Sequence, residues 1–242
     1  MPSTLDAASR LIPRLGRSGG SLSPVPIDET ANPYVGRAGL KLRHALDTFG
    51  VNPHGLVCAD FGCNVGGFTD CLLQAGARQV YALDTGYGVL DWKLRNDPRV
   101  VVMERTNALH APAPQPDPAH PAGVDLIAVD MGWTPQKLCI PAALRWLKPP
   151  ASAPGSARII TLIKPHYEAS AAGERVALRE GVLDEATAEQ VFQRVIDSLP
   201  LLGVRVEAST RSPLVGGAGK GKSSRGRGNI EFLALLAPAA TA

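Results

Sequence analysis

The chain has 242 residues, of which 45% are hydrophobic and 19% are charged. This composition predicts one globular domain with a substantial core, and it excludes a chain that is disordered throughout. The formal net charge of +3 is too small to indicate a polyanionic partner by itself. The sequence shows no apolar run suited to a signal peptide or a membrane span, so we expect a cytoplasmic protein without a membrane partner.

The four cysteines form no CxxC pair, and three of them lie inside apolar runs. This pattern favours buried, reduced thiols over a zinc site or a disulfide framework. We therefore expect no metal, and we predict that these thiols belong to the core: Cys58, Cys63, Cys71 and Cys139.

Residues 1–34 are rich in proline, glycine and serine and carry too little apolar surface to fold alone, which predicts a flexible N-terminal arm followed by one domain at 35–242. Three arginines of this arm could contact phosphates: Arg10, Arg14 and Arg17.

A helix is expected from Val35, because apolar residues recur at helical spacing until Gly50 ends the pattern. The other face of this helix carries a basic stripe made of Arg37, Lys41 and His44.

Short β-type runs then alternate with helical patterns, which predicts βα units and a parallel sheet covered on both faces. The expected strands are 56–60, 79–84, 99–103, 125–130 and 158–164, and the expected helices are 67–75, 135–147 and 185–199. Pro141 should kink the second of these helices or mark its true start. Five prolines in 111–123 forbid a helix after the third strand and favour a surface loop with polyproline character.

The C-terminal region predicts a hairpin. Residues 204–209 alternate as a half-exposed strand does, and 230–236 read as a buried one. No helix connects them, so the last strand should be antiparallel. The glycine-rich segment between them carries four cations without an acid: Lys220, Lys222, Arg225 and Arg227.

Ligands of an open parallel sheet bind beyond the carboxyl ends of its strands. The residues that end the expected strands there are Asp60, Asp84, Asp130 and Lys164. An antiparallel last strand places its first residues at the same edge, which brings Glu231 to this group. One charge at a strand end is common solvation, whereas several at one edge indicate a site.

The segment 60–69 (DFGCNVGGFT) reads as a strand end, a glycine-rich loop and a helix start. Glycine lets such a loop turn sharply and approach a ligand closely. Its GxxxGG spacing lacks the dinucleotide fingerprint, so NAD is disfavoured. S-adenosylmethionine (SAM) fits better, because its amino acid end needs backbone hydrogen bonds and its ribose suits a carboxylate such as Asp84. The alternative is a glycine-rich turn of an unrelated α/β fold.

Residues 216–223 satisfy the GxxxxGKS spacing of a phosphate-binding P-loop, but they lead into a strand rather than a helix, so we reject that interpretation. A basic hairpin loop that follows an RNA backbone, or one that is merely solvated, explains the same residues.

The segments 34–42 (YVGRAGLKL), 66–70 (GGFTD), 84–95, 104–107 (ERTN), 163–165 (IKP) and 228–232 (GNIEF) resemble the FtsJ-like ribose methyltransferases, especially their hemolysin-A-like (TlyA) branch. The resemblance spans about 34–236. It implies a Rossmann-like class I SAM-dependent methyltransferase fold of seven strands. It also implies a catalytic tetrad of Lys41, Asp130, Lys164 and Glu231, and a SAM site formed by Gly62, Gly66, Gly67, Phe68, Asp84, Asn107 and Asp130.

The chain departs from the TlyA pattern in three places. The arm is too short for the N-terminal RNA-binding domain of that branch, which leaves the substrate open. Within the domain, residues 64–65 (NV) and residues 131–133 (MGW) beside Asp130 also differ. Trp133 could stack on a substrate base or pack at the rim of the site.

We expect SAM-dependent 2′-O-methylation of ribosomal or other structured RNA, with RNA contacts from the basic loop and from Arg37 and His44. The alternatives are a non-catalytic RNA- or ribosome-binding protein, which a complete tetrad disfavours, and a small-molecule methyltransferase, which the basic segments disfavour.

Overall fold

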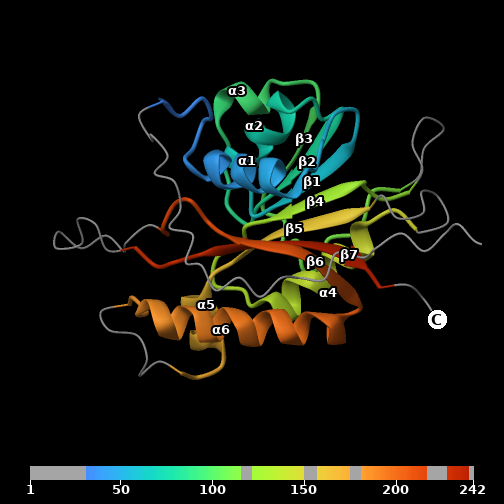
Figure 1. Cartoon of the computed structure of the whole chain (residues 1–242). Coiled ribbons are helices and arrows are strands. Elements are labelled where there is room, and N and C mark those ends of the chain that lie inside the picture. The colour runs from blue at the N-terminus through green and yellow to red at the C-terminus, as the bar shows by residue number, and fades with distance from the viewer. Residues whose placement is uncertain (1–30, 116–121, 150–156, 175–180, 217–227, 240–242) are drawn as a thin grey trace, which may run out of the picture.

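The computed structural model describes residues 31–115, 122–149, 157–174, 181–216 and 228–239. Within them a central sheet is covered by helices on both faces, so that the molecule has three layers (Figure 1). Most of the predicted N-terminal arm and the central prolines of 111–123 lie outside the described residues.

The sheet has seven strands in the order β3-β2-β1-β4-β5-β7-β6. Strands β1 to β5 pair in parallel, whereas β7 is antiparallel to both β5 and β6. The predicted mostly parallel sheet with an antiparallel last strand is therefore confirmed. The strand bounds are β1 Val57–Phe61, β2 Gln79–Leu83, β3 Val100–Met103, β4 Leu126–Val129, β5 Arg158–Ile163, β6 Val204–Arg211 and β7 Phe232–Pro238.

The predicted helices are present, with shifted ends. Helices α1 (Ala38–Phe49), α2 (Gly67–Gln74) and α3 (Trp92–Arg95) cover one face of the sheet, and α4 (Gln136–Trp146), α5 (Pro165–Ala171) and α6 (Glu185–Ser198) cover the other, with a 3₁₀ turn at Leu199–Leu202 after α6 (Figure 1). Gly50 ends α1, as predicted, and it adopts the left-handed conformation there, but the helix begins at Ala38 rather than Val35.

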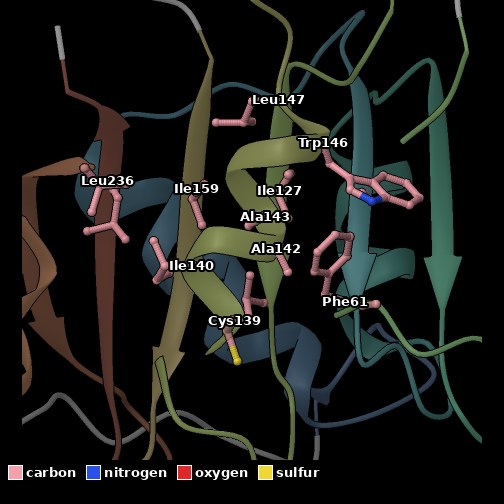
Figure 2. Packing of buried hydrophobic residues seen from close by; sticks show 14 of the residues in the cluster. Phe61, Ile127, Cys139, Ile140, Ala142, Ala143, Trp146, Leu147, Ile159 and Leu236 are labelled. Carbon is pink, nitrogen blue, oxygen red and sulfur yellow. The ribbon is translucent and has the colours of Figure 1, made fainter. Parts of the chain in front are cut away.

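Helix α4 runs through Pro141, so this proline does not mark its start. A proline at this position removes only one helical hydrogen bond, the bond to the carbonyl of Lys137. The apolar face of α4 packs on the sheet around Cys139, Ile140 and Trp146 (Figure 2). The Trp146 ring meets Phe61 edge-on at 5.2 Å, and its Nε1 donates to the Ala111 carbonyl. Burial of this face therefore outweighs the lost bond.

Alternate residues of the strands enter two cores. In β1, Val57, Ala59 and Phe61 face α4, whereas Cys58 faces α1 and α2. All four cysteines are buried and unpaired, as the sequence predicts. Burial raises the pKa of each thiol. In the described part of the chain, no helix is long and apolar enough to cross a membrane.

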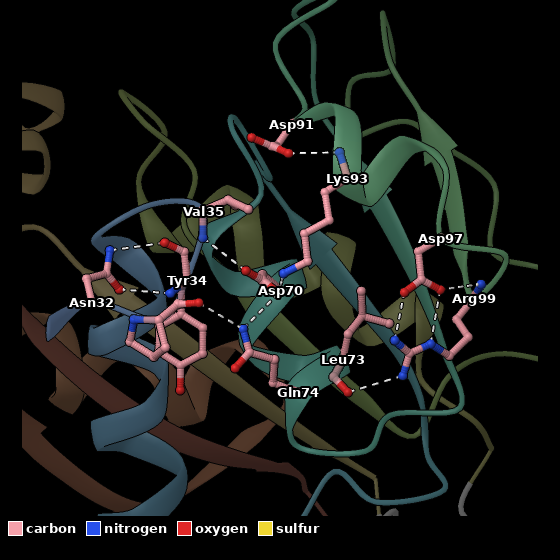
Figure 3. Close-up of polar contacts among 11 residues, drawn as sticks. Asn32, Tyr34, Val35, Asp70, Leu73, Gln74, Asp91, Lys93, Asp97 and Arg99 are labelled. Atoms are coloured by element: carbon pink, nitrogen blue, oxygen red, sulfur yellow. Dashed lines mark hydrogen bonds and ion pairs between the residues drawn. The ribbon is translucent and has the colours of Figure 1, made fainter.

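Asp70 of α2 fixes the segment that enters α1 (Figure 3). One carboxylate oxygen accepts the amide of Val35 at 2.9 Å, and the other meets Gln74 Nε2 and Lys93 Nζ at 3.0 and 3.3 Å. Gln74 Nε2 also donates to the Pro33 carbonyl. These bonds bring α1 and its basic stripe next to the glycine-rich loop.

Candidate functional site

Charged residues gather at the carboxyl edge of the parallel strands. Asp60 is the second-last residue of β1. Asp84, Asp130 and Lys164 directly follow β2, β4 and β5, and Glu231 directly precedes the antiparallel β7. Strand order thus brings these five residues to the edge at which the sequence predicts them.

The four residues of the predicted tetrad form two ion pairs. Lys41 Nζ pairs with Glu231 Oε2, and the two side chains are 7% and 4% exposed. Lys164 Nζ pairs with Asp130 Oδ1, and these side chains are 14% and 18% exposed. Both pairs are therefore largely shielded from water. In such an environment, the loss of one partner leaves the charge of the other poorly compensated.

The charge of Lys164 depends on its neighbours. Burial lowers the pKa of Lys164, but the charges of Asp130 and Glu231 and the hydrogen bond to Asp130 outweigh burial and raise this pKa above its usual value. In the absence of a ligand, Lys164 is therefore an ammonium group at neutral pH.

The basic stripe of α1 faces the β6–β7 hairpin. Arg37 Nη2 donates to the Val215 carbonyl at 2.7 Å, Lys41 pairs with Glu231, and His44 Nε2 lies 3.3 Å from Thr210 Oγ1. The predicted RNA-binding residues Arg37 and His44 therefore hold α1 against this hairpin, whatever else they contact. The predicted RNA-binding residues Lys220, Lys222, Arg225 and Arg227 lie outside the described residues.

The ends of the basic loop close directly over Glu231. The Gly216 amide donates to the Asn229 carbonyl at 2.7 Å, and a Cβ atom at Gly216 would lie 2.5 Å from Glu231 Oε1. Only glycine permits this approach without displacing the carboxylate. The base of the loop and the Lys41–Glu231 pair are thus one packed unit.

The glycine-rich loop joins β1 to α2, as predicted. Gly66 has φ +100, and a Cβ atom there would collide with the Leu94 side chain of α3. Gly62 lies against the backbone of Asp130, and Gly67 lies against α1. Packing within the protein therefore requires glycine at these three positions, independently of any contact with a ligand. The N-terminus of α2 points to the carboxyl edge, where free amides can bind a carboxylate.

Two loops converge beside that helix end. The Asp84 carboxylate accepts the amides of Asn64 and Gly86 at 2.9 and 2.7 Å, which ties the glycine-rich loop to the end of β2. The Arg105 amide donates to the Gly86 carbonyl, and Asn107, two residues further along the chain, is exposed. The Asn107 side chain caps the next turn by accepting the Leu109 amide at 3.0 Å. A carboxylate can accept further hydrogen bonds, so Asp84 still has capacity for a ribose.

Asp60 carries an unsatisfied buried atom. Its Oδ2 accepts from Thr69 Oγ1 at 2.7 Å, but Oδ1 is buried and has no partner among the described residues. Burial raises the pKa of Asp60 to about 7, and the charges of Asp130 and Asp84 add to this shift. A hydrogen-bond donor of a ligand, such as an ammonium group, would satisfy this atom.

These observations fit SAM, whose amino acid end carries both an ammonium and a carboxylate. Asp60 and the amides at the start of α2 suit these two groups, and Asp84 suits the ribose. Phe68 can contribute only its backbone, because the residue is 2% exposed and its side chain packs in the core. The sequence predicts Asp60 at this edge but does not predict that it binds the cofactor.

Backbone strain is concentrated at the same edge. In the described residues, three residues other than glycine have positive φ: Asn64 in the glycine-rich loop, Arg105 after β3 and Trp133 after β4. Such conformations cost free energy and cluster at functional sites. Trp133 is also 82% exposed, and its ring packs at a tilt against Tyr167, with 4.6 Å between the ring centres. Neither Tyr167 nor His166 beside it carries a signal in the sequence, since both follow Lys164 without any periodic pattern.

Comparison with known proteins agrees with this geometry. A protein of Bacillus subtilis named rRNA methyltransferase YqxC is 37% identical over 226 residues, which cover 92% of this chain and 73% of that protein. The 16S/23S rRNA (cytidine-2′-O)-methyltransferase TlyA of Mycobacterium tuberculosis is 39% identical over 142 residues, 59% of this chain and 49% of that protein. A solved structure described as a hemolysin from Streptococcus thermophilus superposes with a TM-score of 0.72 at 33% identity, covering 86% of this chain and 68% of that one.

The family model of the FtsJ-like methyltransferases matches residues 34–237, which include the glycine-rich loop and all four residues of the two ion pairs. The chain therefore belongs to the FtsJ-like methyltransferases, and its cofactor is S-adenosylmethionine.

Proposed function

We propose that this chain methylates the 2′-hydroxyl of a ribose in RNA, and that ribosomal RNA is the substrate. The observation that carries the proposal is the pair of shielded ion pairs, Lys41–Glu231 and Lys164–Asp130, beside the glycine-rich loop. The names of the relatives support it, since one of them acts on cytidine 2′-oxygens of 16S and 23S rRNA.

When bound, SAM supplies the methyl group and a positively charged sulfonium. The protein has to align the ribose oxygen with that methyl group and remove the hydroxyl proton. We assign proton removal to Lys164 Nζ. Asp130 orients the amine and stabilises the ammonium that forms, and the Lys41–Glu231 pair positions the hydroxyl.

The raised pKa of Lys164 sets a condition for this role. The lysine has to lose its proton before it can accept one, and added positive charge near its Nζ favours the neutral amine. Lys41 lies in the same cluster, and the sulfonium would bring a further positive charge. The two carboxylates that raise the pKa of Lys164 are thus opposed by two cations in the complete site.

An exposed aromatic pair offers a place for the substrate base. Trp133 projects from the edge after β4, and Tyr167 lies beneath it, with the Lys164 ammonium 5.6 Å from the Tyr167 ring centre. Aromatic side chains bind RNA bases by stacking once these are turned out of a helix. A base on Trp133 would hold its own ribose near Lys164.

Transfer of labelled methyl groups tests the proposed function. The protein is incubated with methyl-labelled SAM and separate pools of ribosomal and transfer RNA, and the RNA is digested to nucleosides. We expect label in a ribose-methylated nucleoside of the ribosomal pool. Label in a base would overturn the assignment of the reaction, and label in transfer RNA alone would overturn the assignment of the substrate.

A further inference from the structure

His166 occupies an unusual position beside the two ion pairs. It is the second residue of α5, directly after Lys164 and Pro165, and its ring packs at a tilt against Tyr167, with 4.1 Å between the ring centres. Its Nδ1 is buried, yet it has no hydrogen-bond partner in the part of the chain that the structure describes. Buried polar atoms are paired in nearly all native proteins, so this nitrogen requires an explanation.

The imidazole is neutral in this environment. Burial lowers the pKa of His166 to about 4, and the charges of Lys164 and Lys41 contribute to the shift. The ring therefore lies within the field of both lysines of the site. At neutral pH one ring nitrogen carries a proton and the other is a free acceptor, so either can take part in a hydrogen bond with an uncharged polar group.

The neighbours of the ring indicate what that group is. Trp133, Tyr167 and His166 form a row of tilted ring contacts, in which the exposed Trp133 is one end and the half-buried His166 is the other. A nucleotide that places its base on the exposed Trp133 and its ribose at Lys164 would present polar atoms to the inner end of this row. Ribose and base edges carry the neutral donors and acceptors that an imidazole nitrogen pairs with.

We propose that His166 Nδ1 forms a hydrogen bond with the nucleotide whose ribose is methylated, so that His166 contributes to binding and positioning the substrate. The inference rests on the proposed function, because it requires a nucleotide at Lys164. The nitrogen is then unsatisfied only in the free protein, and the substrate supplies its partner.

Three substitutions at this position distinguish the packing of the ring from the hydrogen bonding of its nitrogens. His166→Phe keeps a ring against Tyr167 and removes both nitrogens, His166→Asn places an amide near the position of Nδ1, and His166→Gln places one near Nε2. His54→Phe is the matched control, since His54 is exposed and precedes β1 at the opposite edge of the sheet. Each protein is assayed for unfolding by urea, SAM affinity by calorimetry, and kcat/KM on ribosomal RNA.

We expect His166→Phe to be as stable as the wild type or more stable, because it removes an unsatisfied buried nitrogen. Its SAM affinity should stay within twofold, and its kcat/KM on RNA should fall about threefold to tenfold, the effect of one neutral hydrogen bond. His166→Asn should recover most of that loss, whereas His166→Gln should not. The control should match the wild type.

Two results would overturn the inference while the wild type remains active. One is an unchanged kcat/KM in His166→Phe, which would show that no substrate atom depends on the nitrogen. The other is a loss of stability in His166→Phe that His166→Asn restores, which would show that the nitrogen is satisfied in the free protein. A wild type that methylates no ribose would instead overturn the proposed function, and this inference with it.

Discussion

Replacement of Lys164 by arginine separates its charge from its ability to accept a proton. Arginine can keep the ion pair with Asp130, but its guanidinium stays protonated and cannot act as a base. We expect Lys164→Arg to bind SAM nearly as the wild type does and to lose about 10² to 10⁴ in single-turnover rate. Lys164→Ala should lose as much rate and also stability, because it leaves Asp130 shielded without a partner. A fully buried pair broken in this way costs about 3–5 kcal/mol, and the cost here should be smaller because Asp130 is 18% exposed.

The pH dependence of the wild type gives an independent test of the same role. From the ordinary lysine pKa of 10.5, about one Lys164 in a thousand would be neutral at pH 7.5, and the raised pKa of the free protein makes that fraction smaller. The logarithm of the single-turnover rate should therefore rise by about one unit per pH unit between pH 6.5 and 9.5, unless the complete site lowers the pKa into that range, where the profile would level off.

The Lys164–Asp130 pair should not confound this profile, whereas ionisation of Asp60, whose pKa is about 7, affects only its lower end. A lysine whose folded pKa is raised contributes stability that is fully present below its ordinary, unfolded pKa of 10.5 and is lost only as the pH rises through the folded value. The Lys164–Asp130 pair is thus intact over the whole window. A Lys164→Arg protein that keeps more than half of the wild-type rate, or a wild-type rate independent of pH, would refute the assignment of Lys164 as the base.

Three further predictions concern the cofactor, the basic loop and its anchor. Asp84→Asn should weaken SAM binding by about tenfold or more in calorimetry, since a hydrogen bond to a charged group contributes about 1.5–3 kcal/mol; unchanged affinity would remove Asp84 from the site. Arg37→Ala should lower the free energy of unfolding in urea by about 0.5–1.5 kcal/mol through loss of the bond to Val215, whereas Arg37→Gln, which keeps an amide donor, should lose less; equal losses would contradict this anchoring role. Neutralising the four cations of the basic loop, Lys220, Lys222, Arg225 and Arg227, should weaken RNA binding and flatten its dependence on salt without changing SAM affinity. An identical salt slope in the variant and the wild type would mean that these cations are merely solvated.

The regular part of the fold follows from local patterns. Buried strands and amphipathic helices leave periodic signals, and the end of each strand then fixes which residues reach the carboxyl edge. The antiparallel last strand follows because the segment after β6 contains no helical pattern. Asp84, Asp130, Lys164 and Glu231 therefore lie around the edge at which the sequence predicts them.

Elements without a periodic apolar pattern cannot be predicted from the sequence. Helices α3 and α5 have four and seven residues, too few to show an apolar face. Helix α4 continues through Pro141 because tertiary packing outweighs one missing hydrogen bond. These are cases in which long-range contacts override the local preference.

Side-chain partners in the site could not be predicted either. The sequence indicates a basic stripe on α1, but only the structure shows that Arg37 meets Val215 and that His44 meets Thr210. It likewise gives no sign of the orphaned oxygen of Asp60 or the orphaned nitrogen of His166, since both result from packing between distant segments.

Alkaline hydrolysis of the methylated RNA tests ribose methylation most directly. Alkali cleaves RNA only where a free 2′-hydroxyl can attack the adjacent phosphate, so a 2′-O-methyl group protects the bond that follows it. After reaction with methyl-labelled SAM and ribosomal RNA, the label should be recovered in alkali-resistant dinucleotides, and Lys164→Arg should yield little of it. Label recovered in mononucleotides would place the methyl group on a base and contradict 2′-O-methylation.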